Sequence, residues 1–382
     1  MGKLKVCSKC VMDESDPSLI LDNKNECNYC NDFFKKFGRV ENGGPFFDVK
    51  NLQKEADYIK ENQKDKDFDV IVGLSGGADS SYTALITKKL GLRAAYVHFD
   101  SGWNTAVSSN NIKQTLDFLN GELFTHVTHW ETMKSVQKSF FINGEINCDI
   151  PQDHAFLAIL IKFSKEMQIP YIVSGHNFAT EFVMPMSWGY TSHDSSYIKR
   201  INSYFEASDL SLFPQYNPYK YLLAQKLNLG LNFIRPLNFY SYDKDKIQNE
   251  MKDLIGWQSY KNKHGESKFT SFFQNYYLFE KFGIDKRKAH YSSSVLSGLM
   301  TRDDALSLLS SKPYKDNEIE FQIDFFAEKL GFTSHEFIKI MNENKNTNTF
   351  MRSLIISGLR KGMHRGPSHM FKELFSGNLR KE

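Results

Sequence analysis

Between residues 69 and 255 the chain alternates short runs of branched apolar residues with longer segments that carry apolar residues at helical spacing. This alternation predicts right-handed βαβ units, and therefore an α/β fold with a mostly parallel sheet and flanking helices. Ligands of such sheets bind beyond the carboxyl ends of the strands, so we expect the site there. The expected strands are 70–74, 94–99, 123–127 and 171–173, and the expected helices are 80–90, 111–119, 131–141 and 154–167.

Two further parts flank this α/β region. Residues 1–48 hold four of the five cysteines and end near a Gly-Gly-Pro turn, which predicts a small separate module. Residues 49–255 form the α/β domain, which begins with a helix and a charged connector. From residue 256 to residue 382 the pattern becomes helical and basic, which predicts a helical C-terminal region.

Composition and charge exclude some classes of protein. Hydrophobic residues make up 41% and charged residues 24% of the chain, as in ordinary globular proteins. The net charge of +3, from 48 basic and 45 acidic residues, is too small to indicate a nucleic-acid or membrane partner. No apolar run approaches the roughly 20 residues of a membrane span, and no apolar signal segment precedes the first cysteines. We therefore expect a cytoplasmic protein that binds neither a membrane nor a nucleic acid.

Four cysteines form two C-x-x-C pairs, Cys7 with Cys10 and Cys27 with Cys30. Because the cytoplasm keeps thiols reduced, pairs at this separation predict a four-thiolate zinc site, with a redox-active pair as the alternative. Four thiolates close the coordination shell of zinc and leave no position for water. The expected Zn²⁺ is therefore structural, and it would fold a module with too little core of its own.

The first expected strand ends abruptly at S-G-G-A-D-S, ahead of an expected helix. Gly76 and Gly77 permit backbone conformations that let phosphate oxygens approach main-chain N–H groups, and the helix adds its positive N-terminal end. Ser75 and Ser80 add hydroxyl donors. A Gly-Gly turn between a strand and a helix is common, but the complete segment in this position predicts nucleotide binding.

The same loop lacks the lysine with which the common nucleotide loop reaches the terminal phosphate. Its shape suits a pyrophosphate group taken as a unit, which leaves the α-phosphorus of ATP open to attack. Asp79 would repel a phosphate unless it lies aside, caps the helix or acts through a cation such as Mg²⁺.

The segment S-G-G-A-D-S resembles the signature of the PP-loop ATP pyrophosphatases, which cleave ATP between the α and β phosphates to adenylate a carbonyl oxygen. Further motifs, along nearly the whole chain, are similar to those of the N-acetyl sugar amidotransferases of the WbpG/PseA type. They are C-S-K-C-V-M-D, C-N-Y-C, V-H-F-D-S-G-W-N, I-P-Q-D-H-A, S-G-H-N-F-A-T-E, S-W-G-Y and F-G-I-D-K-R-K-A-H-Y-S-S-S-V-L-S-G. One departure is Gly265 in K-H-G-E-S, where a second histidine is expected.

The resemblance implies a fold of the PP-loop, or adenine nucleotide α-hydrolase, type and an ATP-dependent carbon–nitrogen ligase that forms AMP and pyrophosphate. The carbonyl oxygen of an N-acetyl sugar would attack the α-phosphorus of ATP, and ammonia would then displace AMP to leave an acetamidino group. An amide oxygen is a poor nucleophile, so positioning, Mg²⁺ and loop N–H groups must assist it. The sugar would be a nucleotide-linked diacetamido uronic acid or a free nonulosonic acid such as pseudaminic acid, for lipopolysaccharide O-antigen or flagellin glycans.

The resemblance also assigns roles at the ends of the expected strands. Asp153, His154 and His176 are expected to act in catalysis together with Asp79, with either histidine as the proton carrier. A plain helix N-cap is the alternative for Asp153, and a loop cap is the alternative for Asp100. The residues expected to bind ATP are Ser75, Gly76, Gly77, Asp79, Ser80, Asp100, Ser174, Gly175 and Glu181.

Two other segments are candidates for sugar binding. Trp188 and Tyr190 suit a sugar ring, because aromatic faces stack on C–H surfaces, and core packing is the alternative. Lys286 and Arg287 would neutralise pyrophosphate or a substrate carboxylate, or would otherwise belong to a solvated helix face.

The chain shows no sign of a glutaminase of its own. A thiol glutaminase needs an exposed cysteine with a histidine partner, often on a tight turn. The fifth cysteine, Cys148, lacks flanking glycines, and Gly2 at position 2 excludes an N-terminal cysteine nucleophile. We therefore expect a separate glutaminase subunit or subunit pair to supply ammonia, docked on the cysteine module or the helical C-terminal region.

Two other functions fit parts of the sequence. A tRNA-modifying PP-loop enzyme, either a thiolase or a lysidine-type ligase, would also combine such a loop with a zinc module. A single cysteine outside the zinc pairs argues against a sulfur relay, and the charge balance offers no strong footprint for a phosphate backbone. A non-catalytic adaptor with a vestigial nucleotide fold is disfavoured because the loop is intact.

Overall fold

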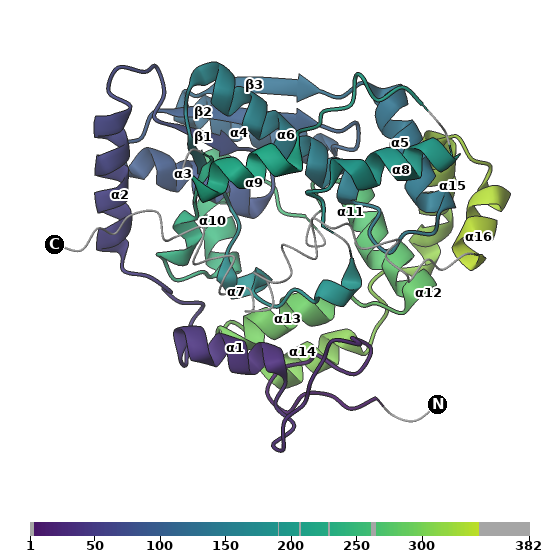
Figure 1. Ribbon diagram of the computed structural model, residues 1–382. Coiled ribbons are helices and arrows are strands. Elements are labelled where there is room, and N and C mark those ends of the chain that lie inside the picture. Colours follow the sequence, from purple (N-terminus) through teal and green to yellow (C-terminus); the bar gives the residue numbers. More distant parts are fainter. Residues whose placement is uncertain (1–3, 190, 206–207, 228–229, 261–264, 344–382) are drawn as a thin grey trace.

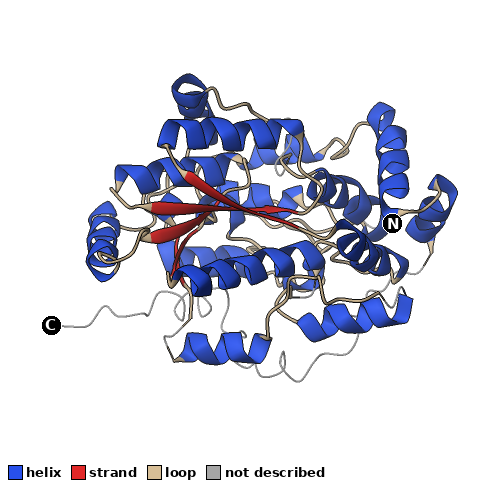
Figure 2. Ribbon diagram, turned by 90° about the horizontal axis from the view of Figure 1, so that it is seen from above, coloured by secondary structure: helices blue, strands red, loops and turns tan. Residues whose placement is uncertain are grey.

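A computed structural model describes residues 4–189, 191–205, 208–227, 230–260 and 265–343. A parallel sheet with the strand order β3-β2-β1-β4-β5 lies inside the molecule, with helices on both sides (Figure 1, Figure 2). The predicted α/β class and mostly parallel sheet are confirmed. The strands are β1 Val70–Gly73, β2 Ala94–Asp100, β3 Glu122–Val127, β4 Tyr171–Val173 and β5 Asn232–Ile234.

The strand order creates a topological switch point beside β1. From β1 the chain proceeds through β2 to β3 on one side, whereas β4 and β5 are added on the other side. Adjacent strands that lead away in opposite directions open a crevice at their carboxyl ends, which is the usual ligand site of such sheets. Ser75 follows β1 and Ser174 follows β4, so both segments reach this crevice.

Alternate side chains of β1 pack into two cores on opposite faces of the sheet. Val70 and Val72 pack with apolar residues of α2, α3, α4 and α10, whereas Ile71 packs with those of α6. The helices of this region are α2 Val49–Asn62, α3 Ala78–Lys89, α4 Ala106–Leu119, α5 Trp130–Ile142, α6 Ile150–Met167, α7 Phe178–Glu181 and α10 Lys244–Ile255. Between β4 and β5 the chain adds α8 Ser195–Phe205 and α9 Pro218–Lys226.

The C-terminal region is helical, as predicted, and packs around buried aromatic side chains. Phe326 stacks on both Trp103 and Phe272, with ring centroids 4.8 and 4.0 Å away. Its elements are α11 Lys268–Phe272, a π-helical turn Phe273–Tyr277, α12 Leu278–Phe282, α13 Arg287–Leu296, α14 Arg302–Leu309, α15 Asp316–Leu330 and α16 Ser334–Asn342. No helix among the described residues is both long and apolar enough to cross a membrane.

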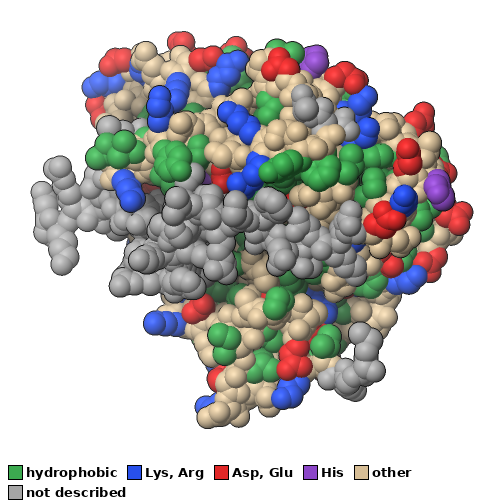
Figure 3. All heavy atoms as spheres, turned by 45° about the vertical axis from the view of Figure 1, so that its right-hand side comes forward, with side chains coloured by type: hydrophobic (Ala, Val, Ile, Leu, Met, Phe, Trp, Pro, Cys, Tyr) green, Lys and Arg blue, Asp and Glu red, His purple; other side chains and the backbone are tan. Residues whose placement is uncertain are grey.

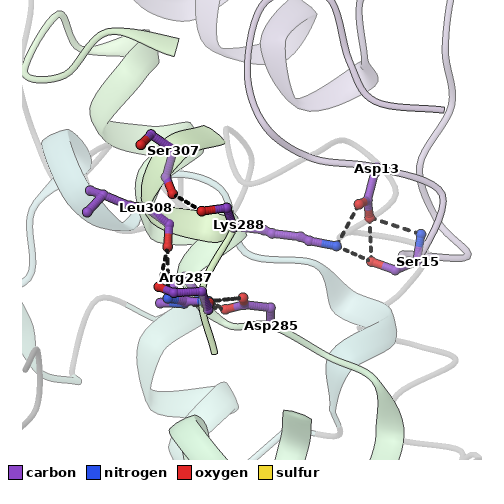
Figure 4. Close-up of polar contacts among 9 residues, drawn as sticks. Asp13, Ser15, Asp285, Arg287, Lys288, Ser307 and Leu308 are labelled. Carbon is purple, nitrogen blue, oxygen red and sulfur yellow. Dashed lines mark hydrogen bonds and ion pairs between the residues drawn. The ribbon is translucent and has the colours of Figure 1, made fainter. Parts of the chain in front are cut away.

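The N-terminal cysteine module, with α1 Asn28–Phe37, docks on this helical region near α13 and α14 (Figure 1). The Lys288 side chain on α13 points to the module, where its Nζ lies 2.6 Å from a carboxylate oxygen of Asp13 (Figure 4). Val11 donates its backbone N–H to the Ser292 hydroxyl. The cysteine module therefore packs on α13 of the C-terminal region.

Candidate active site

The loop between β1 and α3 has a backbone that only glycine adopts without strain at its second position. Gly76 has φ of +79°, and a Cβ there would lie 2.4 Å from the backbone oxygen of Ser108. The Gly76 carbonyl is turned into the protein, where Asn111 (3.2 Å), Trp257 (3.2 Å) and Tyr260 (2.9 Å) donate to it. The following N–H, that of Gly77, donates to the Ser75 hydroxyl at 3.3 Å, and both residues line the cavity.

The hydroxyl groups of this loop face the same space. The Ser75 and Ser80 oxygens lie 3.0 Å apart, and the Ser80 hydroxyl also lies 3.1 Å from the Gly77 carbonyl. Both serines line a cavity of about 560 Å³ at the carboxyl ends of β1, β2 and β4. The structure thus brings the predicted phosphate-binding groups together at the start of α3, where backbone N–H groups and the helix dipole favour an anion.

The segment after β4 forms the second wall of the cavity. Gly175 lies so close to α3 that a Cβ on it would be 2.8 Å from the backbone carbon of Asp79. His176 and Glu181 also line the cavity and are paired, with Nδ1 2.5 Å from the carboxylate. Asp79, in the first turn of α3, also lines the cavity, and its carboxylate accepts a hydrogen bond from Tyr242 (2.5 Å).

The end of β2 forms the third wall, and here the ATP-binding role predicted for Asp100 finds no support. One oxygen of Asp100 accepts from the Gly102 N–H (2.8 Å) and from Asn104 (3.1 Å), so the side chain caps its own loop, and it does not line the cavity. His98 and Asn104 line the cavity in its place. Asn104 donates to Nε2 of His98 while Nδ1 donates to Leu74, and burial lowers the pKa of this imidazole.

The start of α6 separates two predicted catalytic residues. Asp153 lines the cavity, but His154 does not. The His154 ring is buried on the other side of the helix, stacked on Tyr216 at 4.5 Å, with Nδ1 2.7 Å from the Ser192 carbonyl. Burial lowers its pKa to about 4. His154 is therefore a core histidine in this structure, whereas His98 and His176 line the cavity.

Asp149 is a cavity residue that the sequence analysis did not identify. It precedes Asp153 by four positions, which places both on one face of the helix start, and both line the cavity. Its side chain is only 7% exposed. Burial, and then the charge of Asp153, raise the pKa of Asp149 well above its usual range. The i, i+4 spacing of two carboxylates before an apolar helix was the available signal.

Three other cavity residues were also missed, and they come from segments far apart in the sequence. Glu266 lies opposite the phosphate loop, where its carboxylate would be 3.2 Å from a Cβ on Gly77. Tyr242 lies just before α10, Lys244 is the first residue of that helix, and both line the cavity. Spacing along the sequence gives no signal for these contacts, because only the packing of α10 and α11 on the sheet creates them.

A second and larger cavity, of about 1450 Å³, adjoins the first. Thr180, Tyr242 and Lys244 line both cavities. The walls of the larger one come mainly from the C-terminal region, and they include Lys286 and Arg287. The two predicted substrate-binding cations therefore lie at this second cavity.

Two of the residues predicted to bind the sugar, Arg287 and Trp188, are engaged in contacts within the protein. Arg287 forms an ion pair with Asp285 (2.6 Å) and donates to the carbonyls of Leu308 and Ser311, which orients α13 against the end of α14 (Figure 4). Trp188 is buried and lines neither cavity, and Lys286 Nζ lies 5.9 Å from its ring. Core packing, the alternative for this tryptophan, is what the structure shows. Tyr190 lies outside the described residues.

The four cysteines of the N-terminal module converge as predicted. All four side chains are fully buried, and their sulfur atoms lie within 4.8 Å of one another. Zn–S bonds of about 2.3 Å in a tetrahedron place sulfur atoms about 3.8 Å apart, and the contacts Cys7–Cys30, Cys10–Cys27 and Cys27–Cys30 measure 3.7, 3.6 and 3.5 Å. The thiolates fit a single zinc ion. A four-iron cluster would separate them further, since several metal atoms lie between the ligands.

Charge on the visible surface is mixed. On the face in Figure 3, acidic and basic side chains of the described residues are interspersed with hydrophobic ones. A nucleic-acid backbone calls for a basic stripe or patch, and this face shows none among the described residues.

A comparison with known protein families matches one part of the chain, the C-terminal region. Residues 266–360 match the family described as LPS biosynthesis protein WbpG-like, C-terminal domain. A search of curated proteins gave no match.

Three solved structures are similar over part of the chain. NMN synthetase from Francisella tularensis is 14% identical over 56% of this chain and 89% of its own, with a TM-score of 0.29. NH3-dependent NAD synthetase from Campylobacter jejuni subsp. jejuni, in complex with the nitrate ion, is 16% identical over 57% of this chain and 100% of its own, with a TM-score of 0.29. The U34-tRNA thiolase NcsA from Methanococcus maripaludis, with its 4Fe-4S cluster, is 15% identical over 81% of this chain and 89% of its own, with a TM-score of 0.31.

The family match covers most of the region that builds the larger cavity, from Glu266 at the phosphate loop to the helices beyond α13. The α/β part carries the phosphate loop at the switch point of a parallel sheet. The chain therefore joins a C-terminal segment, residues 266–360, that matches the WbpG-like C-terminal domain model to a parallel α/β domain that presents the S-G-G-A-D-S loop.

Proposed function

We propose that this protein is an ATP-dependent amidotransferase that converts an N-acetyl group of a sugar into an acetamidino group. The observation that carries the proposal is the junction of two cavities at Thr180, Tyr242 and Lys244. The smaller cavity contains the phosphate loop, and the larger one is built mainly by the region that matches a WbpG-like domain. ATP in the first and a sugar in the second would meet at this junction.

The first step would adenylate the N-acetyl carbonyl. Its oxygen attacks the α-phosphorus of ATP, a P–O bond forms, and the bond to pyrophosphate breaks. The Gly77 N–H and the hydroxyl groups of Ser75 and Ser80 belong to residues that line the same cavity, and they would hold the leaving pyrophosphate. Mg²⁺ bound with ATP would supply further neutralisation of charge, and Asp79 and Glu266 are the carboxylates beside the loop that fit such an ion.

The second step needs ammonia, and the chain offers no thiol to release it from glutamine. Cys148 is fully buried, and its pKa is raised well above the usual value by burial. A nucleophilic thiol is instead partly exposed, with a lowered pKa. The other four cysteines converge at the metal site. We therefore propose that a separate glutaminase subunit or subunit pair supplies ammonia to this protein in the cytoplasm, for lipopolysaccharide O-antigen or a flagellin glycan.

The same observations disfavour the tRNA-modifying alternative. Thiolation by a relay of cysteines needs accessible thiols, and all five cysteines are buried. The mixed charge of the face in Figure 3 offers no track for tRNA. RNA that co-purifies with the protein and dissociates at high salt would support that alternative.

An isotope experiment tests the proposed reaction. A UDP-linked diacetamido uronic acid and a free N-acetylated nonulosonic acid, each with ¹⁸O in the N-acetyl carbonyl, are incubated with the protein, ATP and ammonium chloride. Carbonyl adenylation transfers the label to AMP, and the sugar that gives labelled AMP is the substrate. Label that stays in the sugar while AMP forms would refute the mechanism. The purified protein should use ammonium but not glutamine.

A further inference from the structure

We propose that Asp149 and Asp153 form a carboxyl pair that accepts the proton which ammonia loses when it attacks the adenylated substrate. This inference rests on the proposed function and concerns its second step. Both residues line the cavity that contains the phosphate loop. The pair would make Asp149 a catalytic residue that no sequence motif indicated.

The contacts of Asp149 hold one oxygen and leave the other for a ligand. Its Oδ1 accepts from Gln152 (2.9 Å) and from Thr270 (3.3 Å). No described residue donates to Oδ2, although the side chain is 7% exposed and lines the cavity. An N-cap aspartate normally accepts from the first turn of its helix, but Asp149 makes no such side-chain bond. The helix therefore does not use this carboxyl as a cap.

Two segments fix the position of this carboxyl. Gln152 comes from the first turn of α6, and Thr270 comes from α11, whose N-cap Ser267 also lines the cavity. The charged groups with the largest effect on the Asp149 carboxyl are Asp153 on α6 and Lys286 at the start of α13. Asp153 raises the pKa of Asp149 and Lys286 lowers it, while burial has the largest effect and raises it. The two carboxyl groups lie four residues apart on one face of the helix start and line the same cavity, so their ionisations are coupled and they titrate as a pair.

Such a pair suits the chemistry of the nitrogen. When ammonia adds to the activated carbon, a C–N bond forms and the nitrogen becomes positively charged. One N–H proton then passes to a carboxylate of the pair. The C–O bond to AMP breaks, its electron pair leaves with AMP, and a protonated acetamidino group remains. Attack without removal of this proton would favour return of ammonia, because ammonia would leave more easily than AMP.

The Asp149→Asn variant separates the two steps. Asparagine keeps an oxygen that can accept from Gln152 and Thr270 but cannot take up a proton at neutral pH. Adenylation is measured as exchange of labelled pyrophosphate into ATP, dependent on the sugar and without ammonia. The second step is measured as ammonium-dependent formation of the acetamidino sugar. We expect the variant to retain exchange and to lose the second step by about 100-fold, the scale of general base catalysis.

Glu145→Gln is the matched control. Glu145 is also buried and its pKa is also raised, but its carboxylate accepts from Asn143 and Tyr197 and lines neither cavity. This variant should retain both steps. A second readout is the pH dependence of the amidination rate at constant free ammonia. The rate should rise as the carboxyl pair ionises in the wild type and in Glu145→Gln, and this rise should be absent in Asp149→Asn.

The outcomes are distinct. Equal loss of exchange and amidination in Asp149→Asn, or wild-type amidination, would overturn the role of the pair. A wild-type protein that shows no exchange with either sugar would overturn the proposed function itself, and the inference with it. Loss confined to the ammonium step supports the assignment.

Discussion

The Arg302 guanidinium on α14 donates to the backbone carbonyl oxygen of Cys7 at 2.8 Å, and thereby joins the C-terminal region to the metal-binding module. The same side chain donates to the Cys10 carbonyl at 3.1 Å. Both acceptors belong to the first C-x-x-C pair. This arginine therefore stabilises the conformation of that pair from 292 residues away.

Replacement of Arg302 by alanine should weaken both the fold and the metal site. Hydrogen bonds from a charged donor contribute about 1.5–3 kcal/mol each. Because the substitution leaves two carbonyl oxygens without their guanidinium donor, we expect the free energy of unfolding to fall by about 2 kcal/mol or more. Urea unfolding measures the free energy, and the rate of zinc transfer to a chelator measures the site. Lys9→Ala is the control, since Lys9 is in the same module but forms only an exposed ion pair at 3.6 Å. Equal effects of the two variants would contradict a specific role for Arg302.

The metal content of the protein gives a second prediction. We expect one zinc per chain by elemental analysis, and loss of zinc in Cys27→Ser, because three thiolates leave the shell open. The module has little core of its own, so loss of metal should unfold it and expose the surfaces of α13 and α14. Cys148→Ser is the control and should keep its zinc, since Cys148 does not belong to the metal cluster. Several iron atoms per chain together with inorganic sulfide would contradict the single-ion site.

The sheet and the phosphate loop could be predicted from the sequence because their signals are local. The four expected strands and the glycines of the loop lie within short continuous segments, and the structure has them within a few residues of those positions. The strand β5 was missed. It has only three residues, Asn232–Ile234, which is too short a run to give a recognisable strand pattern.

Side-chain direction at α6 could not be predicted in the same way. Asp153 and His154 are neighbours in a motif, but consecutive residues of a helix point about 100° apart. The motif shows that this segment is at the site, whereas the packing of α6 decides which side chain reaches the cavity. Asp100 illustrates another limit. A carboxylate that follows a strand gives the same sequence pattern whether it caps a loop, as Asp100 does here, or binds a ligand.

Gly76→Ala tests the conformation of the phosphate loop. Both the φ of +79° and the 2.4 Å approach of a Cβ to the Ser108 oxygen oppose the substitution. Because the loop must shift, we expect ATP binding to weaken by at least about tenfold, which corresponds to about 1.4 kcal/mol. Isothermal titration with a non-hydrolysable ATP analogue measures this.

Gly283→Ala is the matched control for that variant. Gly283 has a φ of +69°, but a Cβ there would meet nothing within 4 Å, and it caps α12 outside the cavity. It should lower stability through backbone strain of about 1 kcal/mol and leave nucleotide binding unchanged. If both variants bind the analogue as the wild type does, the loop does not hold the phosphates.

The pH dependence of stability should reveal Glu145. Burial raises its pKa to about 7 from the usual 4.5, and Tyr197 and Asn143 donate to its oxygens. Between these pH values the folded protein holds a proton that the unfolded chain has released, so this group lowers stability as the pH rises. This rise in the pKa corresponds to about 3 kcal/mol across that window. Glu145→Gln has no such proton to hold.

The free energy of unfolding of wild type and Glu145→Gln is therefore compared at pH 5 and at pH 8. Other titrating groups contribute equally to both proteins, so the stability of the variant relative to wild type should rise between the two pH values. Glu61→Gln is the control, because the Glu61 side chain is 74% exposed and should show no such change. A Glu145→Gln difference that stays constant between pH 5 and pH 8 would show that Glu145 ionises normally in the folded protein, and that burial is offset by its hydrogen bonds.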